Sequence, residues 1–483
     1  MNEHPFKAAP DSFLQWLDHS PDLADLSDVF PEQFPYLLES SARGALGSHS
    51  LLLFAGDKVL VLDADGGVSG PGAGDSFFAR LESWYQSDRT GFSATIEEGK
   101  LLIPFTAGWF VYLGYEMAAE VESTLDLPPN RTGMPDAIAH RCHGAIIIFH
   151  DPQDPASDRS VAVAESKAVL QQIVSCIDRR PAHARSAGAG ALSCLDEEDP
   201  ERYKAAVSRI HDYLSAGDVF QVNISRSWNG AFRADPDPLA LYHSLCRFNP
   251  APFAGLLRWR DCVMLSSSPE RLVQIRDGNI QTRPIAGTRP RGANIGQDQD
   301  LSDELITNVK ERAEHIMLID LERNDLGRVC KSGTVEVNEL MVVESLAHVH
   351  HIVSNVRGEL LPGASPVDAI RAVFPGGTIT GCPKVRCMEI IAELEGEGRG
   401  YYTGSMGYLG RDGSLDLNIL IRSMLVRGRR FEFRTGGGIV ADSAADHEVQ
   451  ETRDKARGML MAIESSSQQV NTGEGEKTCL NAW

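Results

Sequence analysis

The stretch GSMGYLGRDGSLDLNILIRSMLV, residues 404–426, decides the fold class. Two strand-like runs, Gly404 to Leu409 and Leu415 to Val426, flank the dipeptide Asp412-Gly413. An Asp-Gly pair between two such runs is typical of the tight turn of a β-hairpin. The stretch therefore predicts long antiparallel strands in the second half of the chain.

Helices are interspersed among these strands without a regular order. The clearest one follows Asp199, which can cap it, has Pro200 in its first turn and ends at Gly217. The pattern lacks the regular strand–helix–strand alternation that is typical of nucleotide-binding folds. The sequence therefore predicts an α+β protein.

The first third of the chain is rich in short apolar runs. Ser50 to Phe54 and Val59 to Leu62 surround Gly56-Asp57, which predicts another hairpin, and further strands are predicted at Trp109 to Leu113 and Ala145 to Phe149. The composition then changes to Asp, Pro, Ser, Ala and Arg, which indicates a connector with one short helix. The predicted divisions are an N-terminal lobe at 1–150, a connector at 151–198, a catalytic domain at 199–464 and a polar, disordered tail at 465–483.

Composition and charge exclude several classes of function. The 483-residue chain has a formal net charge of -21, which would repel a phosphate backbone, so no nucleic-acid partner is expected. No apolar run approaches the roughly 20 residues that span a bilayer, so no membrane association is expected and a cytoplasmic location is predicted. The nine cysteines form no CxxC pairs, which favours reduced structural thiols over a zinc site or a disulfide framework.

Acidic side chains recur on two predicted helices. A helix over Ser302 to Asp320 places Glu314 and His315 beside apolar neighbours, so a carboxylate there could face a cavity. The alternative is a solvated face on which Lys310 and Arg312 pair with the acids. Spacing alone does not separate these two interpretations.

The second of these helices runs from about Asp442 to Ile463 and carries Glu448, Glu451 and Lys455 along one side. An exposed ion pair between Glu451 and Lys455 is the simpler interpretation of this row. The run Gly436-Gly437-Gly438 precedes the helix, however, and glycines let backbone amides approach a ligand closely. A ligand-binding face is therefore the alternative.

The segment FPGGTITGCPK, residues 374–384, joins a glycine-rich turn to an amphipathic helix that begins near Pro383. Its amides, the Thr378 hydroxyl and the positive end of the helix suit an anionic group such as a carboxylate. The spacing is not that of a Walker loop, and a purely structural turn is the alternative. Two single residues complete the set of candidates, Glu270 and His351, although such residues more commonly have structural roles.

Taken in order, these segments resemble the chorismate-utilising enzyme family, which includes component I of anthranilate synthase and of aminodeoxychorismate synthase. The resemblance runs from about Tyr203 to Ile463, with weaker matches at Tyr36 to Ser40 and Gly108 to Glu116. It implies an anthranilate synthase component I-like fold, with large antiparallel β-sheets, helices packed outside and two interwoven lobes. The motifs that carry it are GDVFQ (217–221), SPER (268–271), PIAGTRPR (284–291), LERND (321–325) and the segments described above.

The resemblance implies a magnesium site beside a chorismate site. Glu314 and Glu451 are expected to hold Mg2+, with Glu448 assisting through a water, because magnesium prefers oxygen ligands and shares its shell with anionic substrates. Thr378 is expected to contact the ring carboxylate. Four positions match contacts to the enolpyruvyl carboxylate of chorismate: Tyr402, Arg422, Gly438 and Lys455.

The resemblance also implies catalytic roles. Glu270 matches the acid that protonates the departing C4 hydroxyl, a task that needs a raised pKa at neutral pH. His351 matches a histidine close to the ring, where it could stabilise charge or move protons. Arg422 is expected to share one face of its strand with Asn418. Together these matches imply acid-assisted replacement of the ring hydroxyl.

Within the family, Gln221 stands where water-adding relatives carry a lysine base, so an amino-transferring member is expected. The segments at 249–254, 376–381 and 415–422 resemble aminodeoxychorismate synthases, whereas Ala286 stands where many of those enzymes carry a lysine that attacks C2. Aminodeoxychorismate, used for p-aminobenzoate and folate, is the favoured product, with direct attack of ammonia or water at C2. Anthranilate formation and a catalytically idle, partner-binding subunit are the alternatives.

Two further expectations concern partners and ligands. The sequence contains no Gly-x-Cys-x-Gly nucleophile elbow, so ammonia is expected from a separate glutamine amidotransferase subunit. The stretch Leu38, Glu39 and Ser40 resembles the tryptophan-binding segment of regulated relatives, but Phe253-Ala254 departs from their second segment. A structural, an inhibitory or no role for tryptophan are all compatible with this pattern.

Overall fold

The fold is built on one extensive antiparallel sheet network. The computed structural model describes residues 13–44, 46–90, 102–179, 188–292, 294–345 and 349–468. Within these residues the strands join into a 21-stranded network, and the strand pairs are antiparallel throughout. The predicted α+β class is confirmed.

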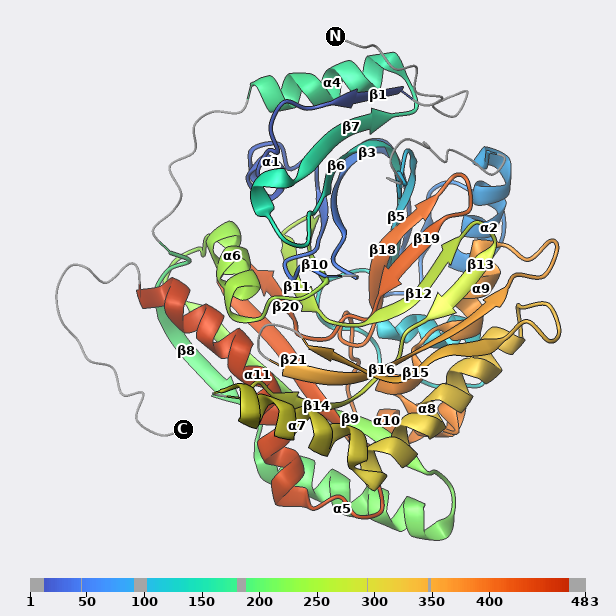
Figure 1. The fold of residues 1–483 in the computed structure, drawn as a ribbon, viewed down its shortest axis with the longest axis vertical. Coiled ribbons are helices and arrows are strands. Elements are labelled where there is room, and N and C mark those ends of the chain that lie inside the picture. The colour runs from blue at the N-terminus through green and yellow to red at the C-terminus, as the bar shows by residue number, and fades with distance from the viewer. Residues whose placement is uncertain are drawn as a thin grey trace.

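Helices lie on the outside of this network. The strands are β1 (Phe13–Trp16), β2 (Tyr36–Glu39), β3 (His49–Leu62), β4 (Val68–Ser69), β5 (Gly108–Leu113), β6 (Ala137–Phe149), β7 (Arg159–Ala164), β8 (Leu192–Glu197), β9 (Gln221–Phe232), β10 (Phe253–Trp259), β11 (Cys262–Ser268), β12 (Arg271–Arg276), β13 (Asn279–Thr282), β14 (Ile285–Pro290), β15 (Glu336–Ser345), β16 (Val349–Glu359), β17 (Gly381–Cys382), β18 (Ser405–Gly410), β19 (Leu415–Asn418), β20 (Ser423–Arg427) and β21 (Arg430–Ile439). The helices are α1 (Leu23–Val29), α2 (Phe77–Asp88), α3 (Ala118–Val121), α4 (Lys167–Asp178), α5 (Pro200–Ala216), α6 (Pro238–Phe248), α7 (Ile295–Thr307), α8 (Val309–Gly327), α9 (Pro366–Val373), α10 (Lys384–Glu395) and α11 (Ala445–Gln468), with short 3-10 turns at Tyr115–Met117, Pro155–Ser157 and Gly377–Ile379. Figure 1 shows α4, α5, α6, α8 and α11 around the outside of the strands.

The N-terminal and C-terminal parts of the chain are interwoven. Strand β5 pairs with β18 over its whole length, so that Gly108 faces Gly410. Strand β2 pairs with β10, so that Glu39 faces Ala254. The core follows this arrangement, because one cluster of buried side chains includes Phe110 from the N-terminal part together with others more than 290 residues later in the chain, such as Tyr402. The predicted interwoven lobes are thus present.

The hairpin predicted around Asp412-Gly413 is present, but its second strand is interrupted. Strands β18 and β19 pair through the turn at Asp412-Gly413, as predicted. The run predicted as one strand from Leu415 to Val426 instead ends at Asn418 and resumes as β20 at Ser423, and Arg422 lies between them with a φ of 50°. The predicted alternation of Asn418 and Arg422 on one strand face is therefore wrong, because remote segments take up the intervening backbone groups: Ile419 N–H donates to the Glu270 carbonyl and Leu420 N–H to the Gly404 carbonyl.

The hairpin predicted at Gly56-Asp57 is also wrong. Strand β3 continues from His49 to Leu62 and pairs along β6, with register shifts between Phe54 and Val59. A β-bulge of this kind bends a strand without ending it. Gly56 serves close packing instead, because a Cβ there would lie 2.3 Å from Nε2 of His143.

The predicted boundaries of one helix are confirmed, whereas another predicted helix is interrupted. Helix α5 has Asp199 as its N-cap and Gly217 at its C-cap with a φ of 79°, as predicted. The helix predicted over Ser302 to Asp320 is in fact two helices, α7 and α8, separated at Asn308, whose side chain accepts a hydrogen bond from the Glu311 N–H at 3.1 Å. Asn308 thus caps the start of α8, which explains the break.

The segment predicted as a connector contributes to the sheet. Between residues 151 and 198 the structure contains the predicted helix, α4, and two strands that the sequence pattern did not reveal. Strand β7 pairs with β1 and β6, and β8 pairs with β9. At the other end, α11 extends to Gln468, so residues 465–468 of the predicted tail are helical, and residues 469–483 lie outside the described part.

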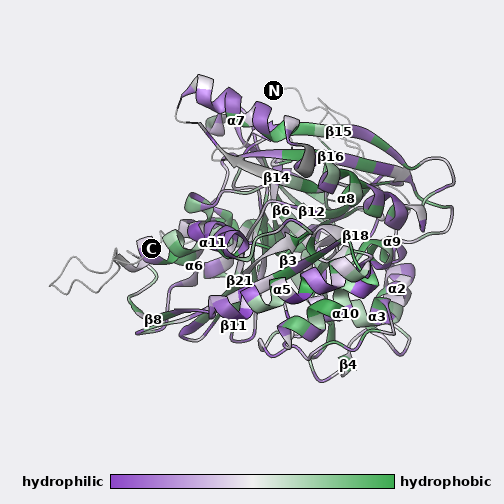
Figure 2. Ribbon diagram, turned by 90° about the horizontal axis from the view of Figure 1, so that it is seen from below, coloured by the Kyte–Doolittle hydropathy of each residue, from purple (hydrophilic) through white to green (hydrophobic). Residues whose placement is uncertain are grey.

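The hydropathy of the helices differs with their position in the fold. Figure 2 shows α7 as largely hydrophilic, whereas α10 contains many hydrophobic residues. Helix α10 buries Cys387, Met388, Ile390 and Ile391 in one core cluster with Ile224 of β9. No helix within the described residues is long and apolar enough to cross a membrane.

Candidate active site

Three consecutive glycines on β21, Gly436 to Gly438, form a flat patch of backbone, here called the glycine floor. It faces the acidic row of α11, which consists of Glu448 and Glu451. A Cβ atom on Gly437 would lie 3.4 Å from Oε2 of Glu448 and 3.8 Å from Oε1 of Glu451. A Cβ atom on Gly438 would lie 1.9 Å from Nε2 of Gln221 on the neighbouring strand β9. The glycine run therefore lets side chains from a helix and a strand converge on the same patch of backbone.

The carboxylates on this floor belong to a compact group of potential cation ligands. Glu448, Glu451 and His447 each offer a ligand atom, and these atoms lie within 4.8 Å of one another. Glu448 is buried, whereas His447 is exposed. Lys455 makes the simple ion pair with Glu451, at 2.7 Å, and donates to the Gly436 carbonyl at 2.9 Å. Both interpretations of the acidic row thus have support, because the ion pair exists and the acids converge.

Glu314 lies on α8 and is half-buried. Among the described residues, the group within 4.8 Å does not include Glu314, so its predicted convergence with Glu451 stays a prediction. The neighbouring His315 has a structural environment: it is fully buried and its Nε2 lies 2.6 Å from the Ser354 hydroxyl. Burial lowers the pKa of His315 to about 4, so this histidine is neutral.

Glu270 is the most strongly perturbed acid that the sequence singled out. Its side chain is buried, and burial raises its pKa from the ordinary 4.5 to about 7. The Thr378 side chain, the Ile285 backbone N–H and the charges of Lys455 and Arg422 oppose this rise. Since burial disfavours the charged form, Glu270 retains its proton into the neutral pH range. That protonation state is the one that a general acid needs.

Arg422 lies at the break between β19 and β20 and is half-buried. Its Nη1 donates to Oδ1 of Asn249 at 3.2 Å, and its charge acts on both Glu270 and His351. A left-handed backbone conformation is unusual for a residue with a long side chain, and such conformations cluster at functional sites. Asn249 was not predicted as a site residue, although it lies in the motif at 249–254.

His351 lies on β16 opposite Thr288 of β14. Burial, the nearby Arg422 charge and His350 lower the pKa of His351 to about 3, despite a hydrogen bond with the Gly287 backbone. The ring is therefore neutral at physiological pH. A neutral imidazole can accept or relay a proton, but it does not supply a positive charge.

The glycine-rich turn approaches Glu270 through Thr378. This residue lies in the 3-10 turn at Gly377–Ile379, and its carbonyl accepts a hydrogen bond from Nδ2 of Asn223 at 3.4 Å. The Thr378 hydroxyl lowers the pKa of Glu270, yet it forms no hydrogen bond of standard geometry within the described residues. A hydroxyl so placed can donate to a bound anion.

Tyr402 lies beside the glycine floor. It is buried, and a Cβ atom on Gly436 would lie 2.9 Å from its hydroxyl. Burial raises the pKa of Tyr402 to about 12 against the opposing charge of Arg399, so the hydroxyl stays a hydrogen-bond donor. The positions matched to the enolpyruvyl carboxylate thus include a buried donor, and two of them adjoin the same floor.

Ala286 lies on β14 opposite Ile352. It is half-buried, and it immediately precedes Gly287, whose backbone bonds to His351. A methyl group therefore occupies a position beside the candidate site, and no side-chain nucleophile is available from it.

A buried acidic pair beneath the glycine-rich turn was missed by sequence analysis. A Cβ atom on Gly377 would lie 3.5 Å from Oε1 of Glu322, which is buried. Burial and the neighbouring Asp325 raise the pKa of Glu322 to about 8. Lys384 forms an ion pair with Asp325 at 2.5 Å, so Asp325 is the charged member and Glu322 keeps the proton. Both acids lie in the LERND motif, but spacing gave no sign of their burial.

The stretch Leu38, Glu39 and Ser40 lines a separate cavity of about 50 Å³. Phe253 and Arg271 also line it, and the Arg271 guanidinium lies 4.9 Å from the Phe253 ring centre. Glu39 accepts a hydrogen bond from the Tyr242 hydroxyl at 2.6 Å. Arg271 follows Glu270 in the chain, so this cavity adjoins the backbone that carries the candidate acid.

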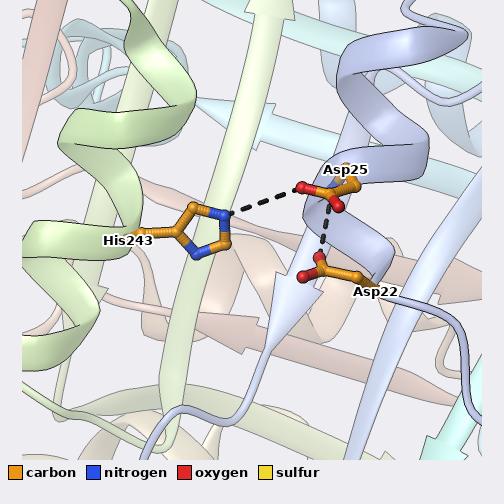
Figure 3. Close-up of side chains that lie close together, drawn as sticks. All are labelled: Asp22, Asp25 and His243. Atoms are coloured by element: carbon orange, nitrogen blue, oxygen red, sulfur yellow. Dashed lines mark hydrogen bonds and ion pairs between the residues drawn. The ribbon is translucent and has the colours of Figure 1, made fainter. Parts of the chain in front are cut away.

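A second group of potential cation ligands has a structural explanation. Asp22, Asp25 and His243 lie within 4.8 Å of one another (Figure 3). Oδ1 of Asp22 accepts the N–H groups of Ala24 and Asp25 at the start of α1, and His243 lies 3.9 Å from Asp25. The group is therefore a helix N-cap with a nearby histidine.

Fold and site together define a class of protein: one antiparallel sheet network carries a buried, protonatable carboxyl near the charges of Arg422 and Lys455, and helix α11 carries a cluster of carboxylates beside it. A family model described as chorismate binding enzyme matches residues 73–461, and the chain belongs to that family. The family predicted from the sequence motifs is thus confirmed.

Known relatives agree on the family but carry two different names. Aminodeoxychorismate synthase component 1 of Bacillus subtilis is 36% identical over 469 residues, which cover 92% of this chain and 96% of that protein. An anthranilate synthase component I-like protein of Synechocystis is 42% identical over 366 residues, which cover 75% of this chain and 74% of that protein. The crystal structure of anthranilate synthase component I from Streptococcus pneumoniae matches with a TM-score of 0.73 at 28% identity, covering 85% of this chain and 92% of that one. The predicted fold is confirmed, and the relatives do not decide the product.

Proposed function

We propose that this chain is component I of an aminodeoxychorismate synthase, which converts chorismate and ammonia to 4-amino-4-deoxychorismate and water. The relative named aminodeoxychorismate synthase component 1 supports this choice because its similarity extends over 92% of the chain. The motifs at 249–254, 376–381 and 415–422 support it as well. Anthranilate synthase is the second candidate, favoured by Ala286 and by the higher identity of the Synechocystis relative over a shorter region.

The observation that carries the proposal is Glu270, a buried acid whose pKa of about 7 keeps it partly protonated at neutral pH. In the proposed reaction the C4 hydroxyl leaves as water with the Glu270 proton. The incoming ammonia loses one proton on becoming an amino group, and that proton restores Glu270. The reaction is therefore balanced without an oxidant or a reductant.

The remaining residues bind and orient the substrate. Two carboxylates on chorismate require at least two groups of donors or cations, and the site offers both. Thr378 is assigned to the ring carboxylate and His351, as a neutral imidazole, to proton movement near the ring. The donors assigned to the enolpyruvyl carboxylate are Tyr402, Arg422, the Gly438 backbone and Lys455, with Gln221 beside Gly438.

A magnesium ion fits the acidic group on the glycine floor. Glu448 and Glu451 offer oxygen ligands, Gly437 leaves the space that a Cβ would fill, and Glu314 is assigned as a further ligand from α8. When bound, the ion would neutralise the ring carboxylate and hold it in the site.

The alanine at 286 shapes the proposed route. Without a lysine at this position, ammonia or water attacks C2 of the ring directly as the C4 hydroxyl leaves. Ammonia then attacks C4 and displaces the group at C2. Each step forms one bond and breaks one. Glu270 gives a proton to each leaving group and recovers it from the nucleophile, ammonia or water, that has just bonded to the ring.

Partners follow from the same proposal. Ammonia is supplied by a separate glutamine amidotransferase subunit, and the isolated chain does not hydrolyse glutamine. Tryptophan is the proposed ligand of the cavity at Leu38, Glu39 and Ser40. Calorimetry with tryptophan, followed by an assay at saturation, separates a structural role, an inhibitory role and the absence of binding.

A product assay tests the function. Purified chain is incubated with chorismate, magnesium and an ammonium salt, and the products are separated by liquid chromatography. Aminodeoxychorismate supports the proposal. Anthranilate with pyruvate as the main product overturns it in favour of the second candidate, and no turnover overturns it in favour of an idle subunit. Glutamine in place of the ammonium salt is the control, for which no product is expected.

A further inference from the structure

Tyr203 on α5 points its hydroxyl into the acidic group. The same Cβ position on Gly437 that lies 3.4 Å from Glu448 and 3.8 Å from Glu451 lies 3.6 Å from the Tyr203 hydroxyl. Tyr203 is only 3% exposed, and its hydroxyl forms no hydrogen bond within the described part of the chain. A buried hydroxyl without a partner is costly, so it points to a group that it binds when the site is filled.

His447 adds a nitrogen ligand to the same group. It stands four residues before Glu451 on α11, hence on neighbouring turns of the helix, and its ligand atom lies within 4.8 Å of those of Glu448 and Glu451. Two ligands of one divalent cation at bond lengths of about 2 Å lie at most about 4 Å apart, so small rotamer changes suffice for all three to bind. Neighbouring acids alone would be weak evidence for a cation site. The buried Tyr203 hydroxyl, which lies close to the same two carboxylates, is a second and independent indication of a bound group.

The donor set decides which cations are favoured. Sites made only of oxygen suit Mg2+, whereas an imidazole nitrogen favours first-row transition metals such as Mn2+, Co2+ and Zn2+. The Lys455 ion pair occupies one side of Glu451 and does not explain the Tyr203 hydroxyl. A cation with one nitrogen ligand and a water held by a phenol hydroxyl accounts for both His447 and Tyr203.

We propose that His447 binds the divalent cation directly and that Tyr203 holds a water on it, so that the site binds Mn2+ in preference to Mg2+. The inference rests on the proposed function in one respect, because it takes Glu448 and Glu451 as cation ligands. It does not depend on which product the enzyme makes.

The test uses the full-length chain and Mn2+ alone. Free Mn2+ is titrated by electron paramagnetic resonance, Mg2+ affinity is measured by competition, and pulsed resonance detects nitrogen bound to the Mn2+ ion. We expect nitrogen coupling in the unaltered chain and its loss in His447→Gln, with Mn2+ affinity lowered about tenfold and Mg2+ affinity changed less than Mn2+ affinity. Tyr203→Phe is expected to weaken both cations about equally and to keep the nitrogen coupling. The matched control is His19→Gln, an exposed histidine on another part of the surface, for which no change is expected.

The outcomes separate this inference from the proposed function. Absence of nitrogen coupling in the unaltered chain, absence of Mn2+ binding, or an unchanged Mn2+ to Mg2+ ratio in His447→Gln overturns the inference. If aminodeoxychorismate still forms in those cases, the proposed function stands. Conversely, nitrogen coupling in a chain that makes anthranilate supports the inference and overturns the function.

Discussion

Turnover should fall as the pH rises through neutrality, because the proposed reaction needs a proton on Glu270 to release the C4 hydroxyl. With a pKa of about 7, Glu270 is half protonated at pH 7. Above that point the protonated fraction, and with it kcat, should drop about tenfold for each pH unit. With the ordinary pKa of 4.5 the same carboxyl would be protonated roughly 300-fold less often at high pH. Burial therefore supplies most of the activity expected at pH 8.

The assay follows kcat from pH 6 to pH 9 with saturating chorismate and magnesium. Total ammonium is adjusted so that the concentration of NH3 itself is the same at every pH, since ammonium also titrates. Glu270→Gln should lower kcat by about a hundredfold or more and should abolish the fall with pH. Glu322→Gln is the matched control, because Glu322 is another buried acid with a pKa of about 8 that is not assigned to the leaving group.

Two results would refute this reasoning. A kcat that stays level or rises between pH 6 and pH 9 would show that no acid of this pKa limits turnover. A fall that persists in Glu270→Gln but disappears in Glu322→Gln would move the acid to the buried pair under the glycine-rich turn.

Three further outcomes can be checked with single variants. Glu270→Gln should be more stable than the unaltered chain at pH 8 by roughly 3 kcal/mol of unfolding free energy in chemical denaturation, because the folded pKa of Glu270, about 7, exceeds its ordinary 4.5 and the unaltered chain loses stability as the pH rises between these values. The same unfolding free energy for the unaltered chain at pH 5 and pH 8 would contradict this. Glu395→Ala should cost about 3–5 kcal/mol of unfolding free energy, since it leaves the buried Arg399 without its 2.7 Å partner, and a cost below about 1 kcal/mol would contradict that role. Gly437→Ala should fold normally but bind Mn2+ about tenfold more weakly in a titration, whereas Gly327→Ala, with open space around it, should bind Mn2+ as the unaltered chain does. Equal Mn2+ affinity in both variants would show that the cation does not bind beside Gly437.

Sequence analysis succeeded where a structural signal is local. Asp199 and Gly217 delimit α5 because a capping side chain and a left-handed glycine act within a few residues of the helix end. The Asp412-Gly413 turn was predicted for the same reason. The Gly56-Asp57 pair carried an equally good local signal, but its backbone lies against β6, more than 80 residues away, and that pairing kept β3 continuous. Local turn signals are thus overridden when a remote strand pairs on both sides of them.

The candidate site was predicted in its residues but not in its geometry. Family motifs supplied Glu270, Glu448 and Glu451 in advance, whereas Tyr203 and His447 carry no pattern of their own. Their role is visible only when α5, α11 and β21 are placed together, since Tyr203 meets Glu448 and Glu451 at Gly437 and His447 joins the same two acids from α11. The raised pKa of Glu270 could be required by the chemistry, but its cause, complete burial against the opposing charge of Arg422, needed the fold.

The break before Arg422 connects fold and chemistry. A continuous strand would alternate side chains between two faces, and it would leave the backbone of residues 419–422 paired in a ladder. Instead, this backbone bonds to Glu270, Gly404 and Ser267, which fixes the candidate acid and Arg422 relative to each other. In the proposed reaction, the Arg422 charge would stabilise the Glu270 carboxylate that remains after proton transfer, while burial of Glu270 keeps the acid protonated beforehand. Both candidate products require this same acid, so the choice between them must depend on what happens at C2, where Ala286 contributes only a methyl group.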